Sequence, residues 1–220
     1  MNKVNFLSRL PEKHLFLLAF LSAITYNSWI LGYILNRSEI NNAYFSVLES
    51  PHKPHYLLYI GLDIISGVLV FLIGLYLLNN YKMYRKILLT YLAFGGLIAL
   101  DAVYPITDKC SSSISVCGSG LAQILSYHDL ISIAEFISIF ILLNFIRKLT
   151  KLHHHVRYKK LIKFNFYLYI FSIIFLIVSI PIDKFTGLSQ GVVVLLSGLA
   201  MMLVPLTIVV DTHREILPKK

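Results

Sequence analysis

Six long apolar stretches constrain the fold of this chain more than any other feature. They cover residues 15–34, 56–78, 87–106, 121–146, 164–182 and 191–210. About 20 apolar residues, at a helical rise of about 1.5 Å per residue, are needed to cross the roughly 30 Å hydrocarbon core of a bilayer. A segment in hydrocarbon must also satisfy its own backbone hydrogen bonds. The sequence therefore predicts an all-α bundle of six transmembrane helices.

The composition agrees with a single membrane domain over residues 1–220. The chain is 57% hydrophobic and only 14% charged, which is more apolar than an ordinary soluble domain. The six stretches take up more than half of the chain, so no separate soluble domain is expected. The first stretch has a longer apolar core than a signal peptide, and we expect it to be a retained helix.

The basic residues predict the orientation of the bundle. Of the 20 Lys and Arg residues, all but Arg37, Lys53, Lys109 and Lys184 lie in the N-terminal tail, the second loop, the fourth loop or the C-terminal tail. The positive-inside rule then places both termini in the cytoplasm. Because the positive charge is divided among four short segments beside the membrane, we expect membrane lipids as partners and no nucleic acid.

The only two cysteines lie in the third loop, which this topology places outside the cytoplasm. Cys110 and Cys117 are separated by a polar segment that is rich in serine. An oxidising compartment permits a Cys110–Cys117 disulfide, which would pin the loop; two free thiols are the alternative.

Polar residues inside the spans point to a candidate site. They are Asp63, Asp101, His128, Asp129 and Glu135, and no Lys or Arg accompanies them within the spans. An Asp at the centre of a membrane helix costs about 2.5–3.5 kcal/mol on insertion scales, so such groups usually face a cavity. The spacing of His128, Ser132 and Glu135 places them on one helical face. The separate spans bring these groups to a similar depth, in the outer half of the bundle.

The chemistry of this cluster is open at the level of sequence. Buried carboxylates without a cation either take up protons or bind one. His128 and Asp129 could bind a divalent metal such as zinc, with a further carboxylate or a histidine of the first loop completing the site. The remaining options are shared protons, a cationic ligand, or polar groups with a structural role only.

Two classes of function follow from these options. In an intramembrane hydrolase acting on a lipid or amphiphile, His128 would be a metal ligand or general base, and Asp101, Asp63 and Glu135 would complete the catalytic set. The alternative is a non-enzymatic transporter, sensor or binding protein linked to protons or cations. Residues 68–78 and 139–143 are almost purely apolar, which argues against an open polar path to the cytoplasm.

The third and fourth spans also carry a family resemblance. The sequence Tyr104-Pro105-Ile106-Thr107-Asp108, followed by His128, resembles a family of prokaryotic six-span membrane proteins of unknown function, the DUF998-like family. The resemblance implies the six-span architecture and the plasma (inner) membrane of a prokaryote. A more distant similarity is to ceramidase-like membrane hydrolases, which use zinc; their last span carries a His-x-x-x-His motif that the sixth span lacks here.

Overall fold

The structure is a computed structural model that describes residues 11–35, 45–51, 53–105, 127–152, 158–182 and 185–216. Within these ranges the elements are α1 (Glu12–Tyr26), α2 (Trp29–Leu35), η2 (Phe45–Glu49), α3 (Tyr56–Asn80), η3 (Lys82–Tyr84), α4 (Arg85–Val103), α6 (Tyr127–Leu152), α7 (Lys159–Ile182) and α8 (Thr186–Ile216). Six helical segments are long and apolar enough to cross a membrane. The predicted all-α, six-span fold is confirmed.

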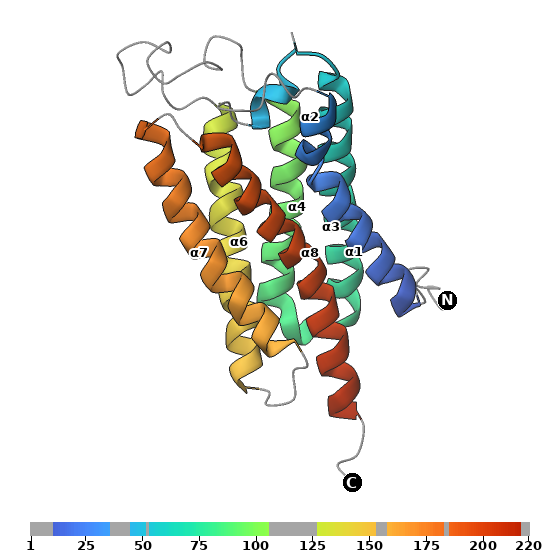
Figure 1. Cartoon of the computed structure of the whole chain (residues 1–220). Coiled ribbons are helices and arrows are strands. Elements are labelled where there is room, and N and C mark those ends of the chain that lie inside the picture. Colours follow the sequence, from blue (N-terminus) through green and yellow to red (C-terminus); the bar gives the residue numbers. More distant parts are fainter. Residues whose placement is uncertain are drawn as a thin grey trace, which may run out of the picture.

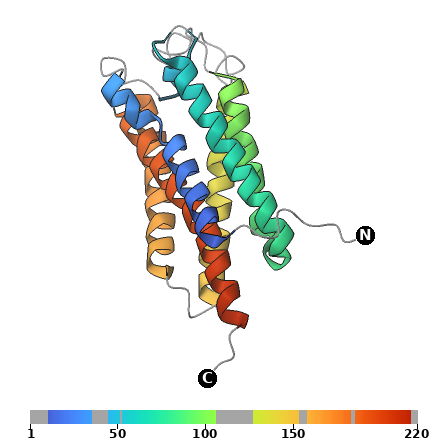
Figure 2. The ribbon, with the colours of Figure 1, turned by 90° about the vertical axis from the view of Figure 1, so that its right-hand side faces the viewer.

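The six long helices lie side by side and alternate in direction along the chain (Figure 1). α3 packs on α4, α4 on α6, α6 on α7 and α7 on α8, and α1 closes the bundle by packing on both α3 and α8. We call the end that carries α2, η2 and the start of α3 the η2 end. The opposite η3 end carries η3, the start of α1 and the end of α8 (Figure 2). The start of α1 and the end of α8 thus lie at the same end of the bundle.

The first predicted span is interrupted within the bilayer region. Its helix stops at Tyr26, and α2 begins at Trp29 after a turn at Asn27 and Ser28. The Asn27 Nδ2 donates a hydrogen bond to the Ala23 carbonyl at 2.8 Å, and the Asn27 Oδ1 accepts one from the Trp29 indole at 3.0 Å. A short polar side chain that bonds to nearby groups in this way competes with the continuation of a helix.

The described ends of the remaining helices differ from the predicted limits by up to six residues. α6 continues through Leu152 and α8 through Ile216, each several residues past the predicted end of its apolar stretch. Residues 106 and 121–126, which were predicted to belong to the third and fourth spans, lie outside the described residues.

Close packing of α3 on α4 depends on glycine. A Cβ atom added to Gly67 would lie 2.6 Å from the backbone nitrogen of Ala99, and one added to Gly95 would lie 2.8 Å from that of Phe71. Side chains at either position would therefore force the two helices apart. This contact fixes the relative position of α3 and α4, and hence of the acidic residues that they carry.

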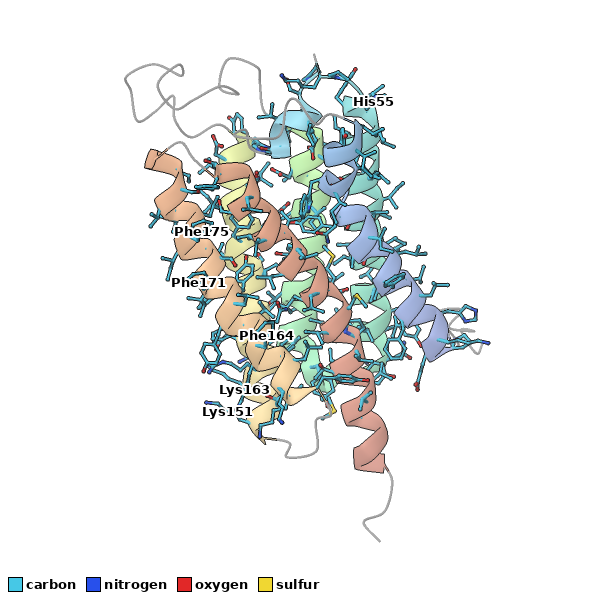
Figure 3. All side chains as sticks on the ribbon, in the orientation of Figure 1. His55, Lys151, Lys163, Phe164, Phe171 and Phe175 are labelled. Atoms are coloured by element: carbon cyan, nitrogen blue, oxygen red, sulfur yellow. The ribbon has the colours of Figure 1, made fainter. Side chains whose placement is uncertain are left out.

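Apolar side chains cover both the inside and the outside of the bundle. The buried core contains residues of every long helix, among them Leu77, Leu88, Ile139, Leu143 and Val204. Phe164, Phe171 and Phe175 lie on the outer side of α7 (Figure 3). An apolar outer surface on helices of this length is typical of a protein that is surrounded by lipid.

Candidate functional site

A small acidic cavity lies at the η2 end of the bundle. Its volume is about 60 Å³, and α1, η2, α3, α4, α6 and α8 all contribute to its wall. Four carboxyl groups line it, those of Glu49, Asp63, Asp101 and Glu135, each from a different element. None of the lining residues that the structure describes is Lys, Arg or His. Any negative charge on these carboxyl groups is therefore not balanced by a cationic side chain of the described lining.

The direction of the helices explains why three of these acids meet. α3 and α6 run away from the η2 end, and Asp63 and Glu135 follow their first residues by seven and eight positions. At about 1.5 Å per residue, both lie roughly 10–12 Å along their helices. α4 runs toward the same end and carries Asp101 near its last turn. Three of the acids named from the sequence thus line one cavity.

Asp101 connects the cavity to His128. The Nδ1 of His128 lies 3.1 Å from an Asp101 carboxyl oxygen. The hydroxyl of Ser132 donates to both Asp101 oxygens at 3.2 Å. His128 is 5% exposed and is not among the residues that line the cavity. The position of His128 beside Asp101 favours a role in orienting the Asp101 carboxyl group.

Glu135 is the most deeply buried acid of the cavity, with 4% of its surface exposed. The Tyr26 hydroxyl donates to its Oε2 at 3.1 Å, and the Tyr26 ring packs edge-on against Phe94. The Oε1 atom of Glu135 has no hydrogen-bond partner among the described residues. A buried acceptor of this kind is costly unless a ligand or water satisfies it.

Glu49 and Asp63 form a pair in the wall of the cavity. Their side chains hydrogen-bond to each other, which requires a proton on one of the two carboxyl groups. Burial, together with the charge of Asp63, raises the pKa of Glu49 well above its usual range. Oε2 of Glu49 and Oδ1 of Asp63 have no hydrogen-bond partner among the described residues. The pair therefore holds a proton and still offers buried acceptors.

Aromatic side chains form much of the remaining wall. Tyr26, Trp29, Tyr59 and Phe136 all line the cavity. The face of an aromatic ring carries partial negative charge and attracts a cation, and most strongly so where water is excluded. The wall thus combines two groups that favour positive charge, carboxylates and aromatic rings.

Glu49 and Tyr26 were not singled out as site residues by the sequence reasoning. Glu49 lies between the first two predicted spans, and the structure buries it in η2 with Val47 and Leu48. A weak signal was available, because Val47-Leu48-Glu49 sets an acid beside two apolar residues in a polar loop. Tyr26 offered no such signal, since its partner Glu135 is 109 residues away in sequence.

The remaining predicted residues are Asp129, which the structure describes, and the two cysteines, which it does not. Asp129 follows His128 on α6 but is not part of the described lining. Within the described residues, no group of three or more His, Cys, Asp or Glu side chains is arranged to hold a metal ion. Cys110 and Cys117, with their predicted disulfide, lie outside the described residues.

Comparison with known proteins assigns the family. The family described as "Protein of unknown function (DUF998)" matches residues 18–207, which is most of the chain. The chain belongs to this family. The expected membership is thereby confirmed, and the DUF998 protein is an integral membrane helical bundle. No curated protein and no solved structure matches the chain, so the ceramidase-like similarity has no support.

Proposed function

We propose that this DUF998 protein binds a small organic cation, an alkylammonium or quaternary ammonium group, in the acidic cavity at the η2 end. The observation that carries the proposal is the set of four carboxyl groups around one cavity of about 60 Å³ whose described lining contains no Lys, Arg or His. A buried carboxylate without a cation is unfavourable by several kcal/mol, so a bound positive charge would stabilise the site. This places the protein among binding proteins, sensors or transporters of cationic ligands.

The wall favours an organic cation over a bare metal ion. A metal ion requires several oxygen, nitrogen or sulfur ligands at about 2.0–2.6 Å around one point. The described residues do not offer such a group. The four aromatic rings supply no such ligand, but they fit the methyl or methylene groups of an ammonium ion through cation–π attraction. The unpartnered carboxyl oxygens of Glu49, Asp63 and Glu135 would accept N–H donors or face the positive charge.

The hydrolase hypothesis receives no support from the arrangement around Asp101. In a Ser-His-Asp triad the imidazole lies between the serine and the carboxylate, because it must take the proton of the serine hydroxyl. Here the carboxylate of Asp101 lies between Ser132 and His128. The Ser132 hydroxyl therefore donates to an acid and is not activated as a nucleophile.

Cation binding at this site would be linked to proton release. The hydrogen bond between Glu49 and Asp63 requires a proton, and a positive ligand beside the pair would favour the loss of that proton. We expect the affinity for the cation to rise with pH over the range in which the pair still binds its proton. A proton-linked binding site of this kind is suited to exchange of a cation against protons.

The test is cation binding by the purified full-length protein in lipid nanodiscs. Tetramethylammonium, choline and ethylammonium are titrated calorimetrically, and 3,3-dimethyl-1-butanol serves as the neutral isostere of choline. We expect at least one of the cations to bind and the neutral isostere not to bind. Glu135→Gln should weaken binding at least tenfold, which corresponds to about 1.4 kcal/mol.

The matched control is Asp129→Asn, which removes an acid of the same helix that does not line the cavity. It should leave the affinity within about twofold of the wild type. The proposal fails if none of the three cations binds more tightly than the neutral alcohol. It also fails if Asp129→Asn weakens binding as much as Glu135→Gln does, because the effect would then be one of net charge alone.

A further inference from the structure

A second cavity lies at the η3 end, at the turn between α3 and α4. Its volume is about 710 Å³, more than ten times that of the acidic cavity, and it is open to the outside of the bundle. Leu75, Leu78, Asn79, Lys82 and Arg85 line it. We call these five residues the η3 groove. It shares no described lining residue with the acidic cavity, so it is a separate feature of the molecule.

The residues of the η3 groove change from apolar to basic between the last turns of α3 and the turn that follows it. Leu78 and Asn79 are three and four positions after Leu75, which places the three residues on one face of α3. Lys82 begins η3 and Arg85 begins α4, so both lie beyond the end of α3. The leucines are thus nearer the middle of the bundle, and the basic residues are at its end. A phospholipid has the same order, with its acyl chains toward the middle of the membrane and its phosphate at the surface.

The turn that carries the two basic residues is firmly held. The backbone N–H of Tyr81 donates to the Leu77 carbonyl at 2.7 Å, and that of Tyr84 donates to the Tyr81 carbonyl at 3.1 Å. Leu77 and Tyr84 are buried in the core of the bundle. Lys82 lies within this anchored segment, Arg85 directly follows it, and both are exposed. The backbone that carries the two charges is therefore held in place, which lowers the entropy cost of binding an anion between them.

The charge of the η3 groove selects the kind of lipid. Its described lining contains two cations, one side-chain amide and no acid. Lys and Arg bind phosphate through charge-assisted hydrogen bonds, and basic pockets of this kind beside membrane helices are suited to acidic headgroups. A zwitterionic lipid would bring its own positive charge next to Lys82 and Arg85, and would bind less tightly.

We propose that the η3 groove is a binding site for one anionic phospholipid. An acyl chain lies along Leu75 and Leu78, and the phosphate is held by Lys82, Arg85 and the amide of Asn79. This inference does not depend on the function proposed for the acidic cavity, since the two sites lie at opposite ends of the bundle (Figure 1).

The test is retention of lipid by the detergent-purified full-length protein, measured by native mass spectrometry. Phosphatidylglycerol and phosphatidylcholine with identical acyl chains are titrated separately. We expect one phosphatidylglycerol molecule to bind at least fivefold more tightly than any phosphatidylcholine. The double variant Lys82→Gln/Arg85→Gln should lose this preference.

The matched control is Lys148→Gln/Lys151→Gln, which removes two exposed basic residues of α6 near the same end of the bundle (Figure 3). It should keep the preference within about twofold of the wild type. Equal losses in the two double variants would overturn the proposal, because attraction to basic residues in general would then explain the binding. Equal retention of both lipids by the wild type would also overturn it.

A third variant tests the apolar part of the η3 groove. Leu75→Trp fills the space along α3 without changing the charge, and Leu75 is 39% exposed, so the bundle core is not disturbed. We expect this variant to weaken phosphatidylglycerol binding severalfold at unchanged thermal stability. Undiminished binding would show that a phosphate alone occupies the site and would overturn the assignment to a phospholipid.

Discussion

Single side chains of the acidic cavity differ in how their charge is compensated. Asp101 has Ser132 and His128 beside it, and Glu135 has the hydroxyl of Tyr26. Glu49 has only another acid as its described hydrogen-bond partner. The Glu49 carboxyl is therefore the group of this cavity that is most dependent on a proton or a ligand.

Glu49→Gln should reduce the pH dependence of stability. The pKa of Glu49 is raised above its ordinary value of 4.5 in the folded protein, so between that value and the folded pKa the folded state binds more protons than the unfolded state. The contribution of the Glu49 carboxyl group to the free energy of unfolding is fully present below about pH 4.5 and is lost as the pH rises through the folded pKa. The loss is at most about 1.4 kcal/mol per pH unit.

The measurement is thermal unfolding of the ligand-free protein in nanodiscs, from about pH 4.5 to about pH 8. The wild type should lose stability with rising pH, and Glu49→Gln should lose less over the same range. Glu12→Gln serves as the control, because Glu12 is exposed and belongs to α1 at the η3 end. An identical slope in Glu49→Gln and the wild type would contradict the prediction.

At the scale of helices, the α3–α4 contact determines how Asp63 and Asp101 are placed. Gly67 and Gly95 allow the two backbones to touch, whereas a Cβ at the neighbouring Gly96 would meet nothing within 4 Å. The two adjacent glycines of α4 thus have different environments, although their sequence contexts are almost identical.

Gly95→Ala and Gly96→Ala should therefore have opposite effects on stability. Gly95→Ala forces a methyl group against the backbone of α3, and overpacking of this kind costs about 1–3 kcal/mol. Gly96→Ala replaces a flexible residue by a better helix former in open space, and should be neutral or stabilising by up to about 1 kcal/mol. Unfolding of both variants in nanodiscs checks the prediction, and similar destabilisation of both would contradict the close approach described here.

For the whole molecule, the closed arrangement of six helices places the acidic cavity and a group of basic residues at opposite ends. The acidic cavity lies at the η2 end. Lys82 and Arg85 lie in and directly after η3, and Lys151 and Lys163 lie toward the same end (Figure 3). The positive-inside rule relates this polarity to the membrane and predicts that the η3 end faces the cytoplasm. The acidic cavity would then receive its ligand from outside the cell.

Cysteine labelling tests this orientation. In a background in which Cys110 and Cys117 are replaced by Ser, His55→Cys should react with a membrane-impermeant maleimide on intact cells, because the exposed His55 lies at the η2 end. Lys163→Cys, at the opposite end, should react only after the membrane is permeabilised. The reverse pattern would place the acidic cavity on the cytoplasmic side.

Much of the architecture was predictable because it depends on local properties of the chain. The length and hydropathy of each stretch predicted the six helices. The spacing of His128, Ser132 and Glu135 predicted a polar helical face. The break between α1 and α2 was not predicted, because the apolar stretch is continuous in composition and the interruption depends on how Asn27 bonds to Ala23 and Trp29.

The sequence by itself determined that this chain is a six-helix membrane protein of the DUF998 family with uncompensated acids in its spans. Only the tertiary structure decided that Asp63, Asp101 and Glu135 share one cavity with Glu49, and that aromatic rings complete its wall. The physical reason is that hydropathy and helical phase are properties of neighbouring residues. A cavity depends on how closely distant helices pack and on which loop covers them, as with Tyr26 and Glu135, which meet across the bundle.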